Sequence, residues 1–254
     1  MYGWRARIGL LIPSANVTME PEFNRFVPEG ISVHVARMMI EDSSENGLAK
    51  MEKGIELAAR QVKGVGPDII VFGCTSGSFF KGSSHNDEIA RFIKDITGIP
   101  VITASQAVVN CLKEIRIRKI VVATPYTDEV NQKEKAFLEE NRIEVLKIKG
   151  LGFYKYEGCF PLIRQPVSHI GLQEPYVAYK LALEVFVEEA DGIFISCTNF
   201  RTFEIIEKLE HAVNRPVVTS SQACLAFALQ ILNIRESIPG LGRILSLNRW
   251  NHPD

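Results

Sequence analysis

Two cysteines occupy matching places in a sequence that repeats itself. Cys74 ends the apolar run in GPDIIVFGCTSGS and Cys197 ends the one in ADGIFISCTNFR, and threonine follows each directly. Further along, IPVITASQA at 99–107 and RPVVTSSQA at 215–223 repeat one order of residues. A thiol can act as a nucleophile, a proton donor or a proton acceptor. A duplicated fold with one thiol in each half predicts chemistry on two faces of one small molecule.

The position of these two thiols favours a chemical role. Each follows a strand-like run and precedes a segment where a helix can begin, so free backbone N–H groups and the helix dipole favour an anion there. We therefore expect the pKa of each thiol to lie below its usual value of about 8.5. The alternative is a small buried apolar residue, as free cysteine often is. Two cysteines at equivalent points of a repeat favour the chemical role.

The other three cysteines do not share this context. Cys111 in NCLKEI and Cys224 in ACLAFAL fall within helical apolar patterns, which predicts core packing for both. Cys159 lies in the loop-like segment YEGCFP, where its role stays open, a structural one being preferred. Five cysteines without close pairing are typical of free thiols in a reducing compartment, so we expect a cytoplasmic protein.

Small polar residues follow both cysteines. Thr75 and Ser76 add hydroxyl groups, and Gly77 lets backbone amides approach a ligand, which together predict a cradle for a carboxylate. The glycine spacing matches neither common phosphate-binding motif. At the matching place in the second half, Thr198 and Asn199 offer a hydroxyl and an amide.

Four further residues lie just after predicted strands. Ser14 and Asn16 follow the first strand, Tyr126 follows the matching strand of the second half, and Arg201 lies in CTNFR. A phenol can donate to a carboxylate or enolate oxygen, and a guanidinium can pair with a second carboxylate. Helix capping, packing and solvation are the structural alternatives for these residues. The predicted site has Cys74 and Cys197 as catalytic residues and Ser14, Asn16, Thr75, Ser76, Tyr126, Thr198, Asn199 and Arg201 as substrate-binding residues.

Composition excludes several classes of function. The chain has 254 residues, 46% of them hydrophobic, with 29 Lys and Arg against 30 Asp and Glu. This balance gives no strong field to attract nucleic acid or an anionic membrane. No apolar stretch approaches the roughly 20 residues that span a bilayer, and the first residues lack a signal-peptide cleavage site. Neither Cys-x-x-Cys nor His-Glu-x-x-His occurs, so no metal site is expected.

Short Val- and Ile-rich runs alternate with helical patterns, which is typical of βα units on parallel sheets. Two lobes of about four strands each are therefore expected, with the active groups between them at the carboxyl ends of the strands. We place the first lobe at 1–116, with 218–254 packing on it, and the second at 117–217. The glycine-, proline- and aromatic-rich stretch 150–173 is interpreted as a flap. Strands are predicted at 7–13, 31–37, 68–73, 101–104, 119–124, 143–148, 192–196 and 217–219, and helices at 46–63, 84–97, 128–140, 175–189, 203–213 and 222–232.

These motifs resemble the cofactor-independent aspartate/glutamate racemase superfamily, in the branch that holds maleate cis-trans isomerase and arylmalonate decarboxylase. The opening IPSANVTMEPE is similar to the isomerase's Pro-Ser-x-Asn-x-Thr-x-Glu segment. The segments TSGSFFKG, ATPYTDEVN and IPGLGRIL resemble the decarboxylase more closely. The resemblance covers nearly the whole chain.

The resemblance implies two Rossmann-like lobes around a pseudo-two-fold axis, with no metal, flavin or pyridoxal phosphate. It implies that Cys74 and Cys197 face the substrate from opposite sides, that Thr75, Ser76 and Tyr126 donate to a carboxylate or enediolate, and that Asn16 helps to hold a carboxylate. It also implies that the chain can form a homo-oligomer. The decarboxylase has glycine in place of Cys74, and the isomerase has an asparagine near 166–168 that this chain lacks.

With both thiols present, the leading prediction is a cofactor-independent isomerase of a small carboxylate or dicarboxylate, of the maleate isomerase or racemase type. The first alternative is an arylmalonate-type decarboxylase in which Cys197 alone donates the proton. The second alternative, from another class, is a small-carboxylate binding protein without turnover.

Overall fold

The strands form where the Val- and Ile-rich runs were predicted. The computed structural model describes residues 1–42, 44–153 and 168–246. The strands are β1 (Ala6–Pro13), β2 (Ile31–Met38), β3 (Ile69–Phe72), β4 (Val101–Thr103), β5 (Lys119–Thr124), β6 (Glu144–Gly150), β7 (Gly192–Ile195) and β8 (Val217–Thr219). The helices are α1 (Met19–Phe26), α2 (Glu45–Glu52), α3 (Ile55–Lys63), α4 (Thr75–Phe79), α5 (Ser83–Thr97), α6 (Ala104–Glu114), α7 (Asp128–Glu140), α8 (Pro175–Val185), α9 (Ile206–Val213), α10 (Ser220–Ile231) and α11 (Gly242–Ser246).

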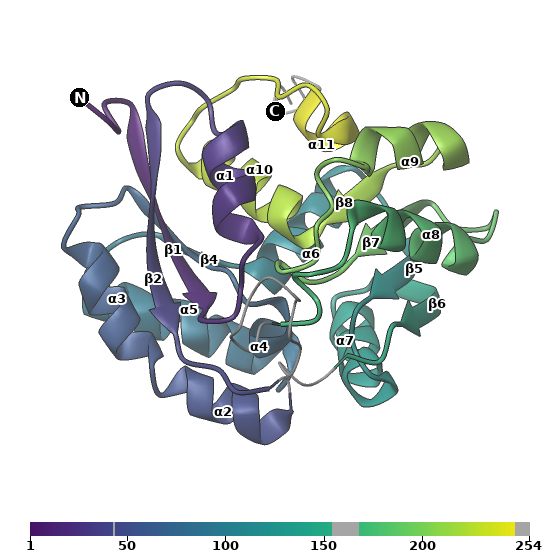
Figure 1. Cartoon of the computed structure of the whole chain (residues 1–254), viewed down its shortest axis with the longest axis horizontal. Helices are drawn as coiled ribbons and strands as arrows, with labels where there is room; N and C mark the ends of the chain where they lie inside the picture. Colours follow the sequence, from purple (N-terminus) through teal and green to yellow (C-terminus); the bar gives the residue numbers. More distant parts are fainter. Residues whose placement is uncertain (43, 154–167, 247–254) are drawn as a thin grey trace.

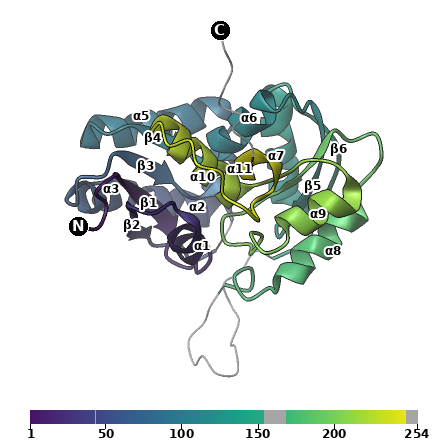
Figure 2. The same ribbon diagram turned by 90° about the horizontal axis from the view of Figure 1, so that it is seen from above.

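The eight strands in the described residues make two parallel sheets of four, which confirms the predicted fold class. The strand orders are β2-β1-β3-β4 and β6-β5-β7-β8, so the second sheet repeats the topology of the first. In both halves the central pair, β1 with β3 and β5 with β7, is completely buried along the paired residues. Parallel strands covered on both faces read as continuous apolar runs, and for this reason their positions could be predicted. The two lobes lie side by side (Figures 1 and 2).

The helices differ from the prediction in three places. The predicted helix at 46–63 is two helices, α2 and α3, because the chain breaks at Lys53 and Gly54 while the apolar pattern stays in phase. Helix α8 ends at Val185 instead of 189, where Phe186 becomes extended. Helix α9 begins at Ile206, three residues later than predicted. Helices α1, α4 and α11 were not predicted, and α6 was anticipated only as the helical pattern around Cys111.

Helices α6 and α10 form the main contact between the halves. They pack against each other, and their small residues Ala104, Ala107, Ala223 and Ala226 are fully buried. The Cys111 thiol lies 4.0 Å from the carbonyl oxygen of Ala223 within this contact. Cys111 and Cys224 are both buried in the apolar core, as predicted.

The C-terminal segment contacts both lobes. Helix α10 packs against α1, β3 and β4 of the first half and against β8 of the second, whereas α11 packs against α9 and β8. The proposed division at residue 217 therefore remains a prediction. Cys159 and most of the predicted flap, residues 154–167, lie outside the described residues.

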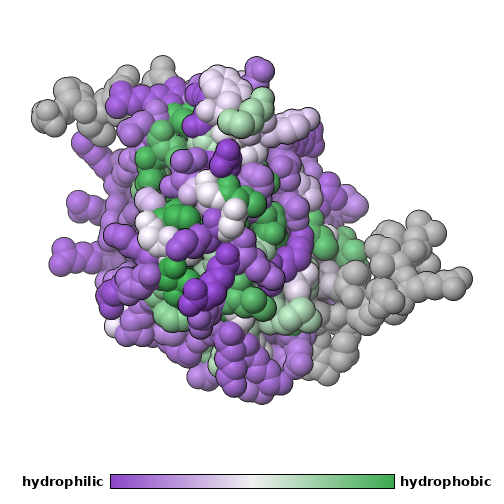
Figure 3. Space-filling view, turned by 90° about the vertical axis from the view of Figure 1, so that its left-hand side faces the viewer, coloured by the Kyte–Doolittle hydropathy of each residue, from purple (hydrophilic) through white to green (hydrophobic). Residues whose placement is uncertain are grey.

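The face on the left-hand side of Figure 1 is mainly polar. Figure 3 shows several separate apolar patches on this face, surrounded by hydrophilic residues. None of the described helices is both long and apolar enough to cross a membrane.

Candidate active site

Cys74 lies where β3 ends and α4 begins. It is the residue before the first turn of α4, and its side chain is only 4% exposed. The Ser76 hydroxyl lies 3.9 Å from the sulfur, and the Gly77 amide donates a hydrogen bond to it. A Cβ atom at position 77 would come within 3.0 Å of the Cys74 sulfur. Glycine at this position therefore lets the first turn of α4 close over the thiol.

Cys197 lies at the matching end of β7 but in a different backbone conformation. Its φ of +93° is unusual for a residue with a side chain, and such strain is found mostly at functional sites. The Cys197 amide donates to the Ser220 hydroxyl at 3.0 Å, which helps to hold this turn. The Asn199 amide N–H points at the Cys197 sulfur at 3.4 Å. Each thiol thus has a backbone donor that would stabilise a thiolate.

Tyr126 lies beside the Cys197 thiol and packs against the first half. It follows β5, is 2% exposed, and its hydroxyl forms a hydrogen bond with Cys197. Its ring packs edge-on against Phe79 of α4, with 6.2 Å between ring centroids. The turn is held by Thr124, whose hydroxyl accepts from the Tyr126 amide at 3.1 Å and donates to Asn131 at 2.6 Å. The phenol therefore contacts the second-half thiol directly and the first half through α4.

Burial gives these groups high pKa values, which makes the expected lowering of the thiol pKa wrong. Loss of solvation raises the pKa of Cys74 to about 11 and that of Cys197 to about 12, although the amide and hydroxyl donors oppose it. The pKa of Tyr126 also lies well above its usual range because the phenol is buried. The helix that follows Cys74 has only five residues, so its dipole cannot offset the burial.

The two thiols are electrostatically coupled. A negative charge on Cys74 raises the pKa of Cys197, and charge on either thiol raises the pKa of Tyr126. Like charges that interact in this way do not ionise together. Both groups are therefore thiols at neutral pH, and if one of them loses its proton, its charge keeps the other protonated as a proton donor.

Asn16, Thr198 and Asn199 join the two halves. The Asn16 carboxamide donates to the Thr198 hydroxyl at 3.1 Å and accepts the amides of Thr18 and Met19 at the start of α1. The Thr198 hydroxyl donates in turn to the carbonyl of Gly73, next to Cys74, at 2.9 Å. These contacts support the capping alternative for Asn16 and give the Thr198 hydroxyl two protein partners.

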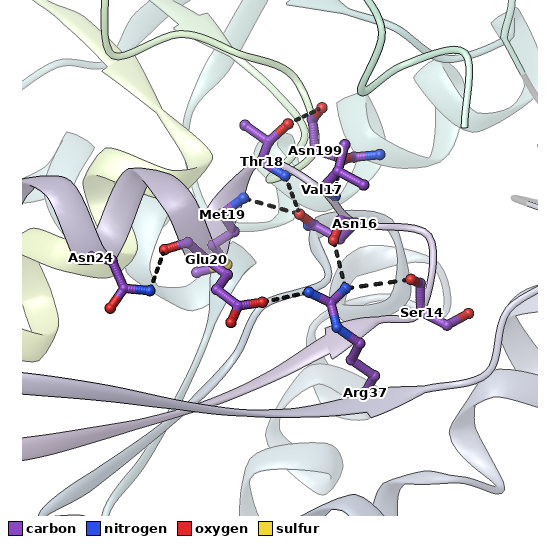
Figure 4. Close-up of polar contacts among 9 residues, drawn as sticks. All are labelled: Ser14, Asn16, Val17, Thr18, Met19, Glu20, Asn24, Arg37 and Asn199. Atoms are coloured by element: carbon purple, nitrogen blue, oxygen red, sulfur yellow. Dashed lines mark hydrogen bonds and ion pairs between the residues drawn. The ribbon is translucent and has the colours of Figure 1, made fainter. Parts of the chain in front are cut away.

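Asn199 forms hydrogen bonds with the loop that leads into α1. Its side-chain oxygen accepts the Val17 amide at 2.8 Å, and its side-chain nitrogen donates to the Ala15 carbonyl at 3.2 Å. Its backbone carbonyl accepts from the Thr18 hydroxyl at 3.0 Å (Figure 4). Asn199 therefore positions the loop, and substrate binding by its side chain remains a prediction.

Arg37 is a positioning residue that the sequence did not reveal. From β2 it donates to the backbone carbonyls of Ser14 and Asn16, at 3.3 and 2.7 Å, and it pairs with Glu20 (Figure 4). The Ser14 hydroxyl accepts the Ile40 amide at 3.2 Å and is partly exposed. A charged residue among the apolar residues of an edge strand was the available signal. Arg37 fixes the loop that carries Asn16.

The ion pairs of Arg201 involve neither thiol. Its guanidinium pairs with Glu204 at 2.8 Å and with Glu174 at 3.7 Å, and 39% of its side chain is exposed. It lines a cavity of about 420 Å³ together with Val17, Glu22 and other residues. Its predicted role in substrate binding is not supported by a contact with either cysteine.

Thr75 and Ser76 are the two hydroxyl groups of the first Cys-Thr turn, and Ser76 already pairs with the Cys74 sulfur. Both side chains are buried, and the Thr75 hydroxyl has no hydrogen-bond partner in the part of the chain that the structure describes. A buried hydroxyl without a partner is costly, so a ligand or water that pairs with it is favoured. Within the described ranges, no cluster of three or more His, Cys, Asp or Glu residues has the arrangement of a metal site.

Two buried carboxyl groups were missed by the sequence reasoning. Glu22 of α1 accepts the amides of Thr202 and Phe203, and Glu134 of α7 accepts the hydroxyl of Ser196. Burial raises the pKa of each carboxyl to about 8. Both lie in helices among other charged residues, so nothing in their sequence context distinguished them.

Comparison with known proteins identifies the family of the chain. The family model of arylmalonate decarboxylase matches residues 8–245. The arylmalonate decarboxylase of Bordetella bronchiseptica is 25% identical over 238 residues, which are 93% of this chain and 95% of that protein. The maleate isomerase of Nocardia farcinica is 26% identical over 251 residues, 94% of this chain and 95% of that protein.

A solved structure has the same fold along almost the full length. It is a variant of the Nocardia farcinica maleate cis-trans isomerase with a covalently bound succinylcysteine intermediate. It matches with a TM-score of 0.86 at 21% identity, covering 95% of this chain and 98% of that one. With a family model that spans both lobes and both cysteine turns, this chain belongs to the arylmalonate decarboxylase family.

Proposed function

We propose that this protein is a two-cysteine isomerase of a small dicarboxylate, of the maleate isomerase type. The observation that carries the proposal is the coupled group formed by Cys74, Cys197 and Tyr126. A reaction that needs only one proton donor has no use for a second thiol with its own thiolate-stabilising donors. The succinylcysteine in the related isomerase is the kind of adduct that a nucleophilic thiol and a cis-alkene diacid would form.

The proposed reaction starts with the Cys74 thiolate. Its sulfur bonds to one alkene carbon, and the π electrons move onto the other carbon and its carboxylate as an enediolate. The Cys197 thiol then protonates that carbon, leaving a single bond about which the adduct rotates. Cys197 finally takes the proton back, and the carbon–sulfur bond to Cys74 breaks to release the trans product.

The enediolate charge requires donors that are in place before it forms. Thr75, Ser76 and Tyr126 are the buried hydroxyl groups near the two thiols, and each well-placed donor is worth roughly 3 kcal/mol of barrier. Removing a donor therefore affects kcat more than substrate binding.

A decarboxylase is the second candidate. It is favoured by the family model and by the relative from Bordetella bronchiseptica. In that reaction a malonate loses CO2, the donors hold the resulting enediolate, and Cys197 alone delivers the proton. Cys74 would then be dispensable.

The test is to incubate the protein in D2O with maleate, with phenylmalonate and with a chiral amino acid. Fumarate formation supports the isomerase, CO2 release supports the decarboxylase, and deuterium at the α-carbon supports a racemase. Inertness toward all three, with tight carboxylate binding, would instead support a binding protein.

Two variants separate the mechanisms. Cys74→Ser and Cys197→Ser should each reduce isomerisation to background, whereas a decarboxylase should survive the first change. Cys111→Ala is the matched control, because this cysteine is buried in the contact between α6 and α10. Full activity in both serine variants would contradict the two-thiol mechanism.

A further inference from the structure

The two Cys-Thr turns differ in backbone conformation although they follow equivalent strands. The residue before each cysteine donates its amide to the neighbouring inner strand, at 2.8 Å in the first half and 2.9 Å in the second. The backbone then diverges, because φ is −132° at Cys74 and +93° at Cys197. A positive φ is rare for a residue with a side chain and persists only where the surrounding structure holds it. A contact found in the second half alone must therefore hold Cys197.

The repeated segment at 99–107 and 215–223 reaches both turns. In each half, the threonine that ends the outer strand, Thr103 or Thr219, pairs with the residue two positions before the cysteine. The residues that follow these threonines begin α6 and α10 and so lie beside the turns. The two copies differ at three positions, and Ala104 against Ser220 is the difference that adds a hydroxyl group.

The next serine of the segment makes the same contact in both halves. The Ser105 hydroxyl donates to the Thr75 carbonyl at 3.1 Å, and the Ser221 hydroxyl donates to the Thr198 carbonyl at 3.4 Å. Both carbonyls belong to the threonine that follows a catalytic cysteine. Because this contact is shared, it does not explain why the two turns differ.

Ser220 makes a contact that the first half lacks. Its side chain is fully buried, and its hydroxyl accepts the Cys197 amide at 3.0 Å. On the other side, the Cys197 carbonyl accepts the Phe200 amide at 3.2 Å. The φ and ψ of a residue are the two rotations between its flanking peptide planes. Since Ser220 holds the plane before Cys197 and Phe200 holds the plane after it, the two contacts together maintain the positive φ. Ala104 has no hydroxyl to do the same for Cys74.

This conformation brings the Cys197 sulfur to its hydrogen-bond donors. The Asn199 amide points at the sulfur at 3.4 Å, and the Tyr126 hydroxyl forms a hydrogen bond with it. Both donors favour the thiolate and oppose the effect of burial on the pKa of Cys197. Because φ sets the direction in which a side chain leaves the backbone, loss of the positive φ would turn the sulfur away from them.

We propose that Ser220 is a positioning residue for Cys197, which holds the backbone conformation in which this thiol meets Tyr126 and the Asn199 amide. The assignment rests on the proposed function, in which Cys197 delivers a proton to the substrate and takes it back. The difference between Ala104 and Ser220 makes the duplicated thiols unequal. Cys74 takes its donors from the first turn of α4, and Cys197 takes one of its donors from a different strand end.

The experiment measures how fast iodoacetamide labels each thiol of Ser220→Ala between pH 8 and pH 10, with mass spectrometry to separate the two cysteines. The substitution changes no charge, and the titratable groups that act on Cys197 are Tyr126, Cys74 and Glu134. We expect labelling of Cys197 to slow about 10-fold, because the thiolate reacts and it has lost its donors. Labelling of Cys74 should stay within about 2-fold. A purely structural role would loosen the turn and speed the labelling of Cys197.

Two further variants provide a rescue and a control. Ser220→Thr keeps the hydroxyl and should label at Cys197 within about 3-fold of the parent. Thr97→Val removes another buried hydroxyl that accepts a backbone amide, that of Ile99 at 3.2 Å, at the end of α5. This control should label like the parent. Labelling of Cys197 in Ser220→Ala that is as fast as in the parent, or faster, would overturn the proposal.

Turnover and structure give two further readouts. In maleate isomerisation, Ser220→Ala should lower kcat about 10-fold or more with little change in KM, because Cys197 acts after the substrate is bound. Labelling needs no turnover, so the two hypotheses fail separately. Parent-like labelling in Ser220→Ala beside an active parent refutes the role of Ser220 alone, whereas slowed labelling beside an inert parent refutes the isomerase alone. A crystal structure of Ser220→Ala in which Cys197 keeps its positive φ and its contact with Tyr126 would also overturn the proposal.

Discussion

At the scale of single residues, the two thiols are held neutral until a reaction needs one of them charged. Burial sets the high pKa values, while the amides of Gly77 and Asn199 give each thiolate a donor. A buried thiol that is not ionised in advance avoids oxidation and metal capture, because both require a thiolate. The cost is that only a small fraction of the protein is in the reactive form at neutral pH.

Because the thiolate is rare at neutral pH, we expect the activity to depend steeply on pH. The pKa of Cys74 is about 11, so the thiolate fraction grows nearly tenfold for each pH unit well below that value. We expect log kcat/KM for maleate isomerisation to rise with a slope near +1 between pH 6 and pH 8, because this ratio reports the ionisation of the free protein. The measurement is initial rate at low substrate over that range. A flat profile would mean that the reactive thiolate is already formed.

At the scale of elements, the ends of β5 and β6 set the position of Tyr126. A Cβ atom on Gly150 would lie 2.1 Å from the Tyr126 carbonyl oxygen and 2.6 Å from the Asn131 side chain, so even alanine does not fit. The backbone of β6 thus approaches the Tyr126 turn as closely as glycine permits.

Gly150→Ala should therefore displace Tyr126. We expect kcat/KM to fall about 10-fold or more because the phenol leaves Cys197, and the overpacked turn to cost roughly 1–3 kcal/mol of stability. Steady-state kinetics and urea unfolding measure the two effects. Gly64→Ala is the control, since Gly64 is exposed at the end of α3 and a Cβ there meets only the Gln61 carbonyl, at 3.2 Å. Parent-like activity in Gly150→Ala would show that the turn is not held this tightly.

The elements also show what the sequence could predict. Apolar runs bounded by glycine and proline identified the eight described strands, because that signal lies within each strand's own sequence. The repeat located both thiols, because each copy can be recognised from a few neighbouring residues. The contacts of Thr198 and Asn199 with the loop at 15–18 were not predictable, since they join residues about 180 positions apart. The strained backbone of Cys197 was hidden as well, because the repeat implied the same conformation as at Cys74.

At the scale of the whole molecule, the halves are joined by buried polar contacts as well as by the α6–α10 core. Glu22 carries one of these contacts from α1 to the segment after the Cys197 turn, accepting the amides of Thr202 and Phe203 at 3.2 and 3.3 Å. Glu134 accepts the Ser196 hydroxyl within the second half, on the helix α7 that packs against α4 of the first. Both carboxyl groups are buried, and burial raises the pKa of each to about 8.

This arrangement predicts that stability falls as the pH rises from about 4.5 to about 8. Burial raises the pKa of Glu22 from 4.5 to about 8, so above pH 4.5 the unfolded chain releases the proton while the folded protein keeps it. The loss is complete once the pH exceeds the folded-state pKa, and its upper size is on the order of 5 kcal/mol for one such carboxyl. Glu22→Gln removes the titration and keeps an acceptor for both amides. We therefore expect a smaller decline in the free energy of unfolding for this variant than for the parent, measured by urea denaturation at pH 5, 6, 7 and 8.

Glu29→Gln, at an exposed position of the same lobe, controls for the change in net charge. A decline as steep in Glu22→Gln as in the parent would place the pH sensitivity elsewhere in the molecule.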